Sequence, residues 1–267
     1  MADGLHMRKS RVLARLRAGD VVLCLKVNLA DARVVEIAGL CGYDCVWTDL
    51  EHVANDWSVI EQQVWAGKAH DTDVMVRVAR GSYSDHVKAL ELDAAGIMVP
   101  HVMHLEDARR VVSMTRFHPV GRRPVDGGNA DGSYTAVDVM DYFREANDQR
   151  FVCVQIEDPE PLPDLEAIAS LPGIDMLFFG PADFSQGIGA PAQWDHPRLL
   201  ETRDRIAHVC AAHGKFAGTV GSPANLRQLV DLGYRFVGMG ADVLAVMEYG
   251  KRTLAECRAA LSRGKGG

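Results

Sequence analysis

FVCVQIE at residues 151–157 and DMLFFGPAD at residues 175–183 are two short apolar runs that each end in an acidic side chain. Their β-branched and aromatic residues favour strands that are buried on both faces, as in a parallel sheet. Parallel neighbours need a helical crossover between them, and the intervening segment is long enough to supply one. Glu157 and Asp183 are therefore expected at the carboxyl ends of adjacent strands.

The same alternation runs through the whole chain. Apolar runs are separated by segments whose apolar residues recur at three- and four-residue spacing, as on one face of a helix. The expected strands cover residues 21–28, 45–52, 74–80, 96–102, 151–157, 175–183, 216–222 and 236–242. Eight such units in 267 residues predict an α/β fold with one domain over residues 1–267, a closed (β/α)8 TIM barrel. A doubly wound open sheet is the alternative.

Three segments lie outside this regular alternation. A helix around residues 5–17 precedes the first strand and is expected to close the bottom of the barrel, and a last helix covers about residues 243–262. Residues 118–134, HPVGRRPVDGGNADGSY, are rich in Gly, Arg and Asp and too long for an ordinary connection. A loop of this kind is typically functional or disordered.

Composition excludes several classes of protein. The net charge of -7 comes from 36 acidic and 29 basic residues scattered along the chain, which argues against a nucleic-acid or anionic-membrane partner. No apolar run approaches the ~20 residues of a membrane span, and the N-terminus has no apolar core of signal-peptide length. The six cysteines include no CxxC pair, which favours reduced thiols. We therefore expect a cytoplasmic protein whose partners are small molecules.

The two acidic strand ends are candidates for a metal site. Burying an isolated carboxylate is costly unless a cation or hydrogen-bond donors accompany it, so Glu157 and Asp183 need a partner. Arg77 or a metal would serve, and the pairing of acids on successive strands beside a Gly-Pro turn favours the metal over two separate salt bridges. Oxygen ligands without a nearby Cys favour Mg²⁺ or Mn²⁺ over Zn²⁺, with Co²⁺ as a further candidate.

Other polar residues at strand ends suggest acid–base chemistry. His52 follows Asp49 by three residues, a spacing that lets the carboxylate orient the ring as a general base. His101 and His104 follow the fourth strand without a carboxylate in the same motif, and we expect them to line the pocket or a loop. Arg77 lies inside VMVRVAR and is expected to bind a substrate carboxylate or oxyanion.

A Schiff-base mechanism needs a desolvated lysine in the barrel mouth. No lysine is expected at a strand end, and the nearest, Lys26, lies midway along the first predicted strand. The sequence therefore favours metal-assisted chemistry over Schiff-base chemistry.

These motifs together resemble the HpcH/HpaI family of class II aldolases. The resemblance runs from about residue 20 to about residue 245 and rests on GYDCVWTDLEHVANDW, the VRV of the third strand, GIMVPHV, QIEDPE and GIDMLFFGPADFSQGIG, in that order. It implies a barrel of the phosphoenolpyruvate/pyruvate type. It also implies a homo-oligomer, commonly a hexamer, with a trimer as the alternative, in which the last helix is exchanged between subunits.

For the site, the resemblance implies specific roles. Glu157 and Asp183 would bind the divalent metal. His52 would work with Asp49 as the base, and Arg77 would hold the pyruvyl oxygens. The other substrate-binding residues implied by the motifs are Gln155, Gly180, Pro181 and Ala182.

The implied activity is the reversible cleavage of a 4-hydroxy-2-oxo acid to pyruvate, or a close analogue, and an aldehyde. An acyl-CoA lyase of the citrate-lyase β type and a metal-binding barrel without catalysis are the alternatives. Asp158 departs from relatives, which often have Thr or Ser after the metal-binding Glu. Selectivity for the aldehyde is expected from the loops after the second and fourth strands, residues 118–134 and a neighbouring subunit.

Overall fold

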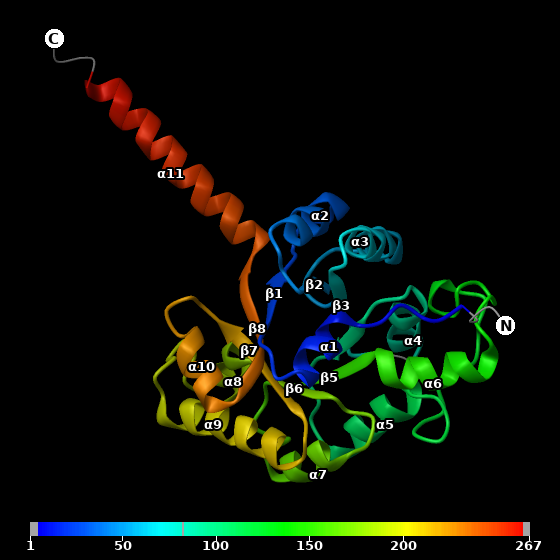
Figure 1. The fold of residues 1–267 in the computed structure, drawn as a ribbon. Helices are drawn as coiled ribbons and strands as arrows, with labels where there is room; N and C mark the ends of the chain where they lie inside the picture. The colour runs from blue at the N-terminus through cyan, green and yellow to red at the C-terminus, as the bar shows by residue number, and fades with distance from the viewer. Residues whose placement is uncertain (1–4, 82, 264–267) are drawn as a thin grey trace.

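The structure is a computed structural model that describes residues 5–81 and 83–263, and it contains a closed barrel of eight parallel strands surrounded by helices (Figure 1). Each strand pairs with the next along the chain, and β8 pairs with β1. The predicted (β/α)8 barrel is therefore confirmed, and the open-sheet alternative is wrong.

Each predicted apolar run overlaps one strand, and β3 and β8 begin one and two residues before the predicted runs. The strands are β1 (Val22–Lys26), β2 (Cys45–Asp49), β3 (Asp73–Arg77), β4 (Gly96–Val99), β5 (Phe151–Ile156), β6 (Met176–Phe179), β7 (Phe216–Gly221) and β8 (Tyr234–Ala241). The helices are α1 (Arg11–Arg17), α2 (Ala32–Leu40), α3 (Trp57–Ala69), α4 (Tyr83–Glu91), α5 (Leu105–Thr115), α6 (Val139–Gln149), α7 (Leu165–Ser170), α8 (Pro181–Gly187), α9 (Pro197–Ala212), α10 (Leu226–Leu232) and α11 (Asp242–Arg263).

The N-terminal helix closes the bottom of the barrel, as predicted. Val12, Leu13 and Leu16 of α1 pack against buried side chains at the amino ends of the strands, in one core cluster with Val22. The helix begins later than the predicted residue 5, because Ser10 is its N-cap and accepts a hydrogen bond from the Leu13 backbone N–H at 3.1 Å.

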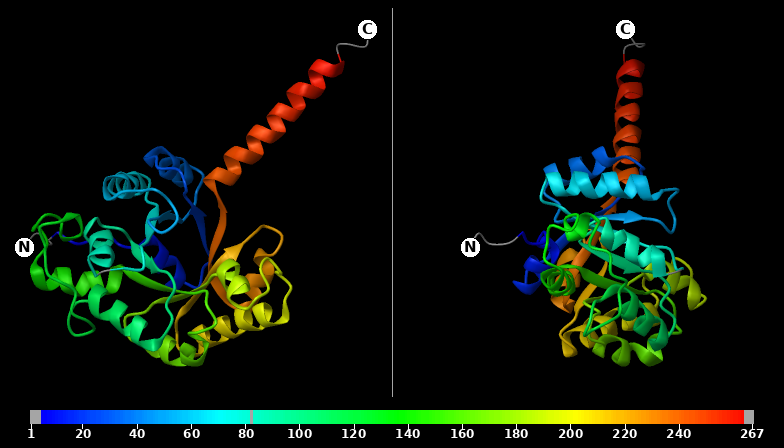
Figure 2. Two further views of the ribbon diagram at one scale, coloured as in Figure 1. Left: turned by 180° about the vertical axis from the view of Figure 1, so that it is seen from behind. Right: turned by 90° about the vertical axis from the view of Figure 1, so that its right-hand side faces the viewer.

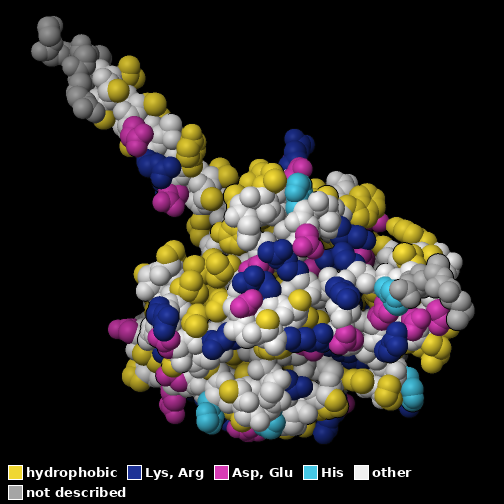
Figure 3. Space-filling view, viewed as in Figure 1, with side chains coloured by type: hydrophobic (Ala, Val, Ile, Leu, Met, Phe, Trp, Pro, Cys, Tyr) yellow, Lys and Arg dark blue, Asp and Glu magenta, His cyan; other side chains and the backbone are white. Residues whose placement is uncertain are grey.

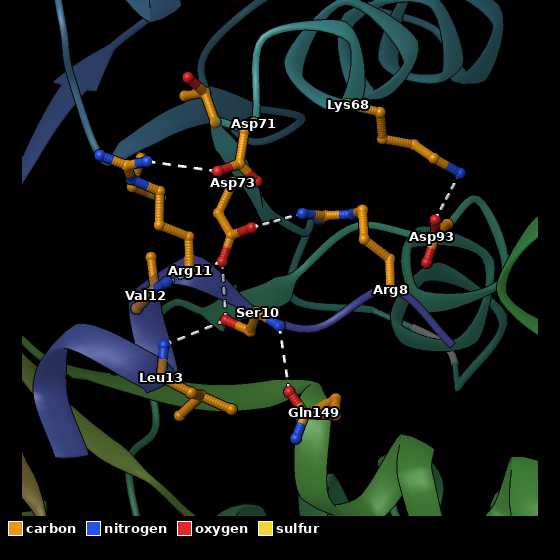
Figure 4. Close-up of polar contacts among 12 residues, drawn as sticks. Arg8, Ser10, Arg11, Val12, Leu13, Lys68, Asp71, Asp73, Asp93 and Gln149 are labelled. Atoms are coloured by element: carbon orange, nitrogen blue, oxygen red, sulfur yellow. Dashed lines mark hydrogen bonds and ion pairs between the residues drawn. The ribbon is translucent and has the colours of Figure 1, made fainter. Parts of the chain in front are cut away.

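Buried charges at this closed end are paired with cations (Figure 4). The Asp73 carboxylate accepts hydrogen bonds from the Ser10 hydroxyl at 2.7 Å and the Val12 N–H at 2.9 Å, and it pairs with Arg8 at 2.7 Å. Asp93 pairs with Lys68 and, on its other side, with Arg150. The amino ends of β3, β4 and β5 are thereby tied to the segment that leads into α1.

Residues 118–134 lie at the same closed end. They follow α5 and lead through α6 into the start of β5, so they belong to the face opposite the carboxyl ends of the strands. Arg123, only 3% exposed, pairs with Asp131 at 2.6 Å, and the Tyr142 hydroxyl donates to the same carboxylate at 2.8 Å. The expectation that this segment selects the aldehyde is therefore wrong for a single chain, because a loop between a helix and the next strand lies at the amino end of the barrel.

Helix α11 confirms the predicted last helix to within one residue at each end. It projects away from the barrel instead of packing on it (Figures 1 and 2). Apolar side chains are exposed along it, and Figure 3 shows hydrophobic side chains over much of its length. They include Leu244, Val246, Met247, Tyr249, Leu254 and Leu261. Over the described part of the chain, none of the helices has the length and apolar character needed to cross a bilayer.

Candidate active site

A pocket of about 500 Å³ lies in the mouth of the barrel, at the carboxyl ends of the strands. Small and apolar residues of β7, β8 and the start of α11 form one wall. Gly180, Pro181 and Ala182, all predicted to bind substrate, form part of another wall. The polar and aromatic lining residues include Lys26, Trp47, His52, Arg77, Gln155 and Asp183.

Glu157 is buried at the end of β5 and lies close to Asp183 in the first turn of α8. Its carboxylate accepts a hydrogen bond from the His101 backbone N–H at 3.0 Å and another from the Gln155 side chain. Burial raises the pKa of Glu157 to about 7, and the negative charges of Glu51 and Asp183 add to this rise against the influence of His101. The pair predicted from the sequence is therefore brought together, in a place where negative charge is poorly compensated.

The residues around Glu157 fit a divalent cation. Carboxylates outnumber permanent cations in this connected cluster, with Asp49, Glu51, Glu157, Asp158 and Asp183 on one side and Lys26 and Arg77 on the other. No group of three or more His, Cys, Asp or Glu side chains forms a metal cage within residues 5–81 and 83–263. A pair of carboxylates with room for water and substrate oxygens suits Mg²⁺ better than a metal that needs an all-protein cage.

Gly180 leaves space beside these carboxylates. A Cβ atom at this position would lie 2.7 Å from Glu157 Oε2 and 2.9 Å from Gln155 Nε2. The glycine before the first turn of α8 therefore allows the backbone to approach Glu157 closely.

Arg77 is held by two acids. It donates from Nε to Asp49 Oδ1 at 3.0 Å, from Nη2 to Asp49 Oδ2, and pairs through Nη1 with Glu51 at 3.0 Å. Burial opposes ionisation of Asp49, but the hydrogen bonds and charge of Arg77 lower its pKa to about 2. Arg77 also stands over the Trp47 ring, 4.7 Å from the centroid. Its orientation is thus fixed before a ligand binds.

The predicted His52–Asp49 contact takes a different form. Asp49 accepts a hydrogen bond from the His52 backbone N–H at 3.4 Å, whereas the His52 ring lies beside Glu51, with 3.6 Å between Nε2 and Oε2. Both Asp49 oxygens instead accept hydrogen bonds from the Arg77 guanidinium. The side chain of His52 is 57% exposed and lines the pocket, with Glu51 as the carboxylate beside its ring.

His101, which the sequence predicts to line the pocket or a loop, contacts the carboxylates of the cluster around Glu157. Its ring lies 2.8 Å from Asp158 and 3.5 Å from Glu51. Burial alone would lower its pKa, but the hydrogen bond to Asp158 and the charge of Glu157 raise it. A φ of +48° turns its backbone N–H toward Glu157. The acidic residue at position 158, where relatives often have Thr or Ser, was the signal in the sequence. Only the fold brings the Asp158 carboxylate to His101 after β4. His104, in contrast, is exposed and stands at the N-cap of α5.

Lys26 corrects the expectation that no lysine lies at a strand end. It is the last residue of β1 and lines the pocket, because the strand ends two residues before the predicted residue 28. Its ammonium pairs with Asp49 Oδ2 at 3.2 Å and lies 5.0 Å from the centroid of the Trp47 ring. The mouth of the barrel therefore holds a lysine at a strand end after all.

Comparison with known proteins places this barrel in a class. A match to the family described as HpcH/HpaI aldolase/citrate lyase spans residues 23–248. A 2-keto-3-deoxy-L-rhamnonate aldolase of Klebsiella pneumoniae is 32% identical over 241 residues, which cover 90% of each chain. A HpcH/HpaI aldolase structure from Desulfitobacterium hafniense superposes with a TM-score of 0.87 at 26% identity, covering 92% of this chain and 96% of that one.

A citrate synthase structure superposes with a TM-score of 0.86 at 27% identity, covering 95% of this chain and 99% of that one. These proteins share a parallel barrel with this chain over nearly their whole length, which makes it a (β/α)8 barrel of the aldolase and citrate lyase class. The chain belongs to the HpcH/HpaI aldolase/citrate lyase family.

Proposed function

We propose that this chain is a divalent-cation-dependent carbon–carbon lyase that reversibly cleaves a 4-hydroxy-2-oxo acid into pyruvate, or a close analogue, and an aldehyde. The observation that carries the proposal is the buried Glu157 beside Asp183, which lines one pocket together with Arg77 and His52. Family membership supports the same class of reaction.

In this proposal, each residue acts on one part of the substrate. Glu157 and Asp183 hold the cation, preferably Mg²⁺ or Mn²⁺, which when bound supplies Lewis-acid stabilisation of the enolate oxygen. Arg77 has N–H groups left after its bonds to Asp49 and Glu51, and these bind the oxygens of the pyruvyl half. His52 removes the proton of the C4 hydroxyl in cleavage.

For the substrate, we propose 2-keto-3-deoxy sugar acids as the first compounds to test. The proposal rests on relatives 32% identical that carry the name 2-keto-3-deoxy-L-rhamnonate aldolase. Such acids have an oxo group at C2, no hydroxyl at C3 and a hydroxyl at C4, which is the pattern that retro-aldol cleavage requires. The apolar wall of β7 and β8 would contact the aldehyde half.

The test is a pyruvate-release assay with purified protein, 2-keto-3-deoxy-L-rhamnonate and Mg²⁺ or Mn²⁺. We expect release to stop with EDTA and to return when the cation is added back. An acyl-CoA thioester serves as the alternative substrate. Carbon–carbon cleavage of this compound, without cleavage of the sugar acid, would favour a citrate-lyase type of activity. Pyruvate release that survives both EDTA and His52→Ala would contradict the proposal.

We also propose that the protein is a homo-oligomer in which α11 packs on a neighbouring subunit. The support is the projection of α11 and its exposed apolar side chains, Leu244 and Met247 among them. Light scattering should give a hexamer or trimer for the full chain. Met247→Lys should lower the mass, whereas Lys251→Arg on the same helix should leave it unchanged. A monomeric full chain would contradict the proposal. The cytoplasmic location stays a prediction.

A further inference from the structure

Lys26 has no role in the mechanism above, yet it lies in the same pocket. Residues of β1 alternate between the inside and the outside of the barrel, and Val22 and Cys24 belong to the inner core cluster. Lys26 continues this inward series at the mouth. Its side chain is 23% exposed, so it is held by neighbours and still reaches the cavity.

The topology sets Lys26 across the mouth from the acidic pair. In a closed barrel of eight strands, β1 lies opposite β5, which ends next to Glu157. Lys26, Gln155 and Asp183 all line the one cavity. A 2-oxo acid held at the β5 and β6 wall would therefore extend its far half toward β1.

Hydrogen bonding leaves Lys26 able to donate. Asp49 is already satisfied by Arg77 and by the backbone N–H groups of Glu51 and His52. An ammonium carries three donors, and the ion pair with Asp49 occupies one of them. The bond to Asp49 and the contact with Trp47 fix the position of the ammonium, and a carboxylate-paired cation suits hydrogen-bond donation better than nucleophilic attack.

Lys26 and Arg77 are neighbouring cations that share one carboxylate. Lys26 and Arg77 both contact Asp49 Oδ2, and both stand against the Trp47 ring. In a 4-hydroxy-2-oxo acid, the oxygens on C2 and C4 are separated by a single methylene group. If Arg77 binds near the C2 oxygen, the neighbouring cation is placed for the C4 oxygen.

We propose that Lys26 is a further catalytic residue, which donates a hydrogen bond to the C4 oxygen of the substrate. The inference rests on the proposed aldolase function. In cleavage, the C4 hydroxyl proton passes to His52, the C4–O electrons form the aldehyde carbonyl, and the C3–C4 electron pair becomes the C2–C3 double bond of the enolate. Lys26 keeps its proton throughout and stabilises the negative charge that develops on the C4 oxygen.

Two reactions of the Mg²⁺-loaded enzyme separate this role from the rest of the site. Retro-aldol cleavage needs the C4 oxygen, whereas exchange of the pyruvate methyl protons with D₂O needs only the enolate half. We expect Lys26→Met to lower kcat for cleavage roughly 100-fold, the scale of losing one oxyanion donor, while proton exchange stays within about 3-fold of wild type. Lys26→Arg should recover part of the loss, and Lys9→Met, at an exposed position, should change neither reaction.

The other outcomes are decisive as well. Unchanged cleavage in Lys26→Met, or an equal loss of cleavage and exchange, would overturn the assignment. A defect confined to KM for substrates with a distal carboxylate would show that Lys26 binds that group instead. A borohydride-trapped adduct of pyruvate on Lys26 would replace the hydrogen-bonding role with a Schiff base. Wild type with neither cleavage nor exchange would sink the aldolase proposal itself, which Lys26 variants alone cannot do.

Discussion

The two ends of the barrel bury charge in opposite ways. At the closed end, Asp73, Asp93 and Asp131 each pair with an arginine. Figure 4 shows the pairing of Asp73 with Arg8. At the open end, carboxylates outnumber the permanent cations, and burial raises the pKa of Glu157 to about 7. Buried ion pairs with matched partners are characteristic of structure, whereas uncompensated carboxylates in a pocket indicate a binding partner that the chain does not supply.

The largest effect should come from removing one uncompensated carboxylate. Glu157→Gln keeps the shape of the side chain but removes the charge that would hold the cation. We expect kcat/KM for pyruvate release to fall roughly 10³-fold, with no loss of thermal stability at pH 8. Glu160→Gln, at an exposed position in the same loop, is the matched control. Full activity in Glu157→Gln would place the chemistry elsewhere.

The closed end should respond in the opposite way. Asp131→Asn leaves the buried guanidinium of Arg123 without a counter-charge, and removing one partner of a buried pair typically costs about 3–5 kcal/mol of unfolding free energy. Because residues 118–134 lie away from the mouth, kcat of the folded enzyme should stay within about 2-fold of wild type. Urea unfolding and pyruvate release measure the two quantities.

Asp126→Asn provides the control in that loop, since Asp126 is exposed and should tolerate the change. A large loss of kcat in Asp131→Asn, with little loss of stability, would mean that the loop takes part in the active site, for example that of a neighbouring subunit.

The fold was predictable because each strand has its own local signal. Eight apolar runs with helical segments between them leave few topologies, and parallel strands bring Glu157 and Asp183 to one edge regardless of exact boundaries. Lys26 was misplaced because its role depends on where β1 ends, and strand ends are the least determined part of such a pattern.

The contacts of His101 and the location of residues 118–134 could not be predicted for a different reason. The carboxylates that contact His101 come from the loops after β2 and β5, so its environment exists only once the barrel closes. The length and composition of residues 118–134 indicated a special loop, but not the end of the barrel at which it lies. Local sequence indicates whether a segment forms a helix or a strand, whereas contacts between residues of distant strands depend on the tertiary structure.

A smaller effect should follow from filling the space beside Glu157. In Gly180→Ala, the new methyl group would lie 2.7 Å from Glu157 Oε2 and would displace the carboxylate. We expect Mg²⁺ binding, measured by calorimetry, to weaken about 10-fold, with less change in folding stability. Gly250→Ala on α11, where nothing lies within 4 Å of the added Cβ, should leave Mg²⁺ affinity unchanged. Equal affinity in both variants would argue that Glu157 does not hold the cation.

The smallest effect concerns pH in chelator-treated protein. The pKa of Glu157 is about 7 in the folded state against 4.5 for a free carboxyl, so between these values the folded state holds a proton that the unfolded state has released. The free energy of unfolding should therefore fall as pH rises from about 4.5 to 7, by an amount on the order of 2–3 kcal/mol. The raised pKa of His101 acts in the same direction, because its stabilisation is lost as pH rises through its folded-state value.

Saturating Mg²⁺ should reverse the trend, since the cation binds the ionised carboxylate. Urea unfolding across this pH range checks the sign, and in Glu157→Gln the fall should shrink to the His101 contribution. A chelated wild type whose stability rises with pH would mean that Glu157 is already compensated, and the contrast between the two ends of the barrel would disappear.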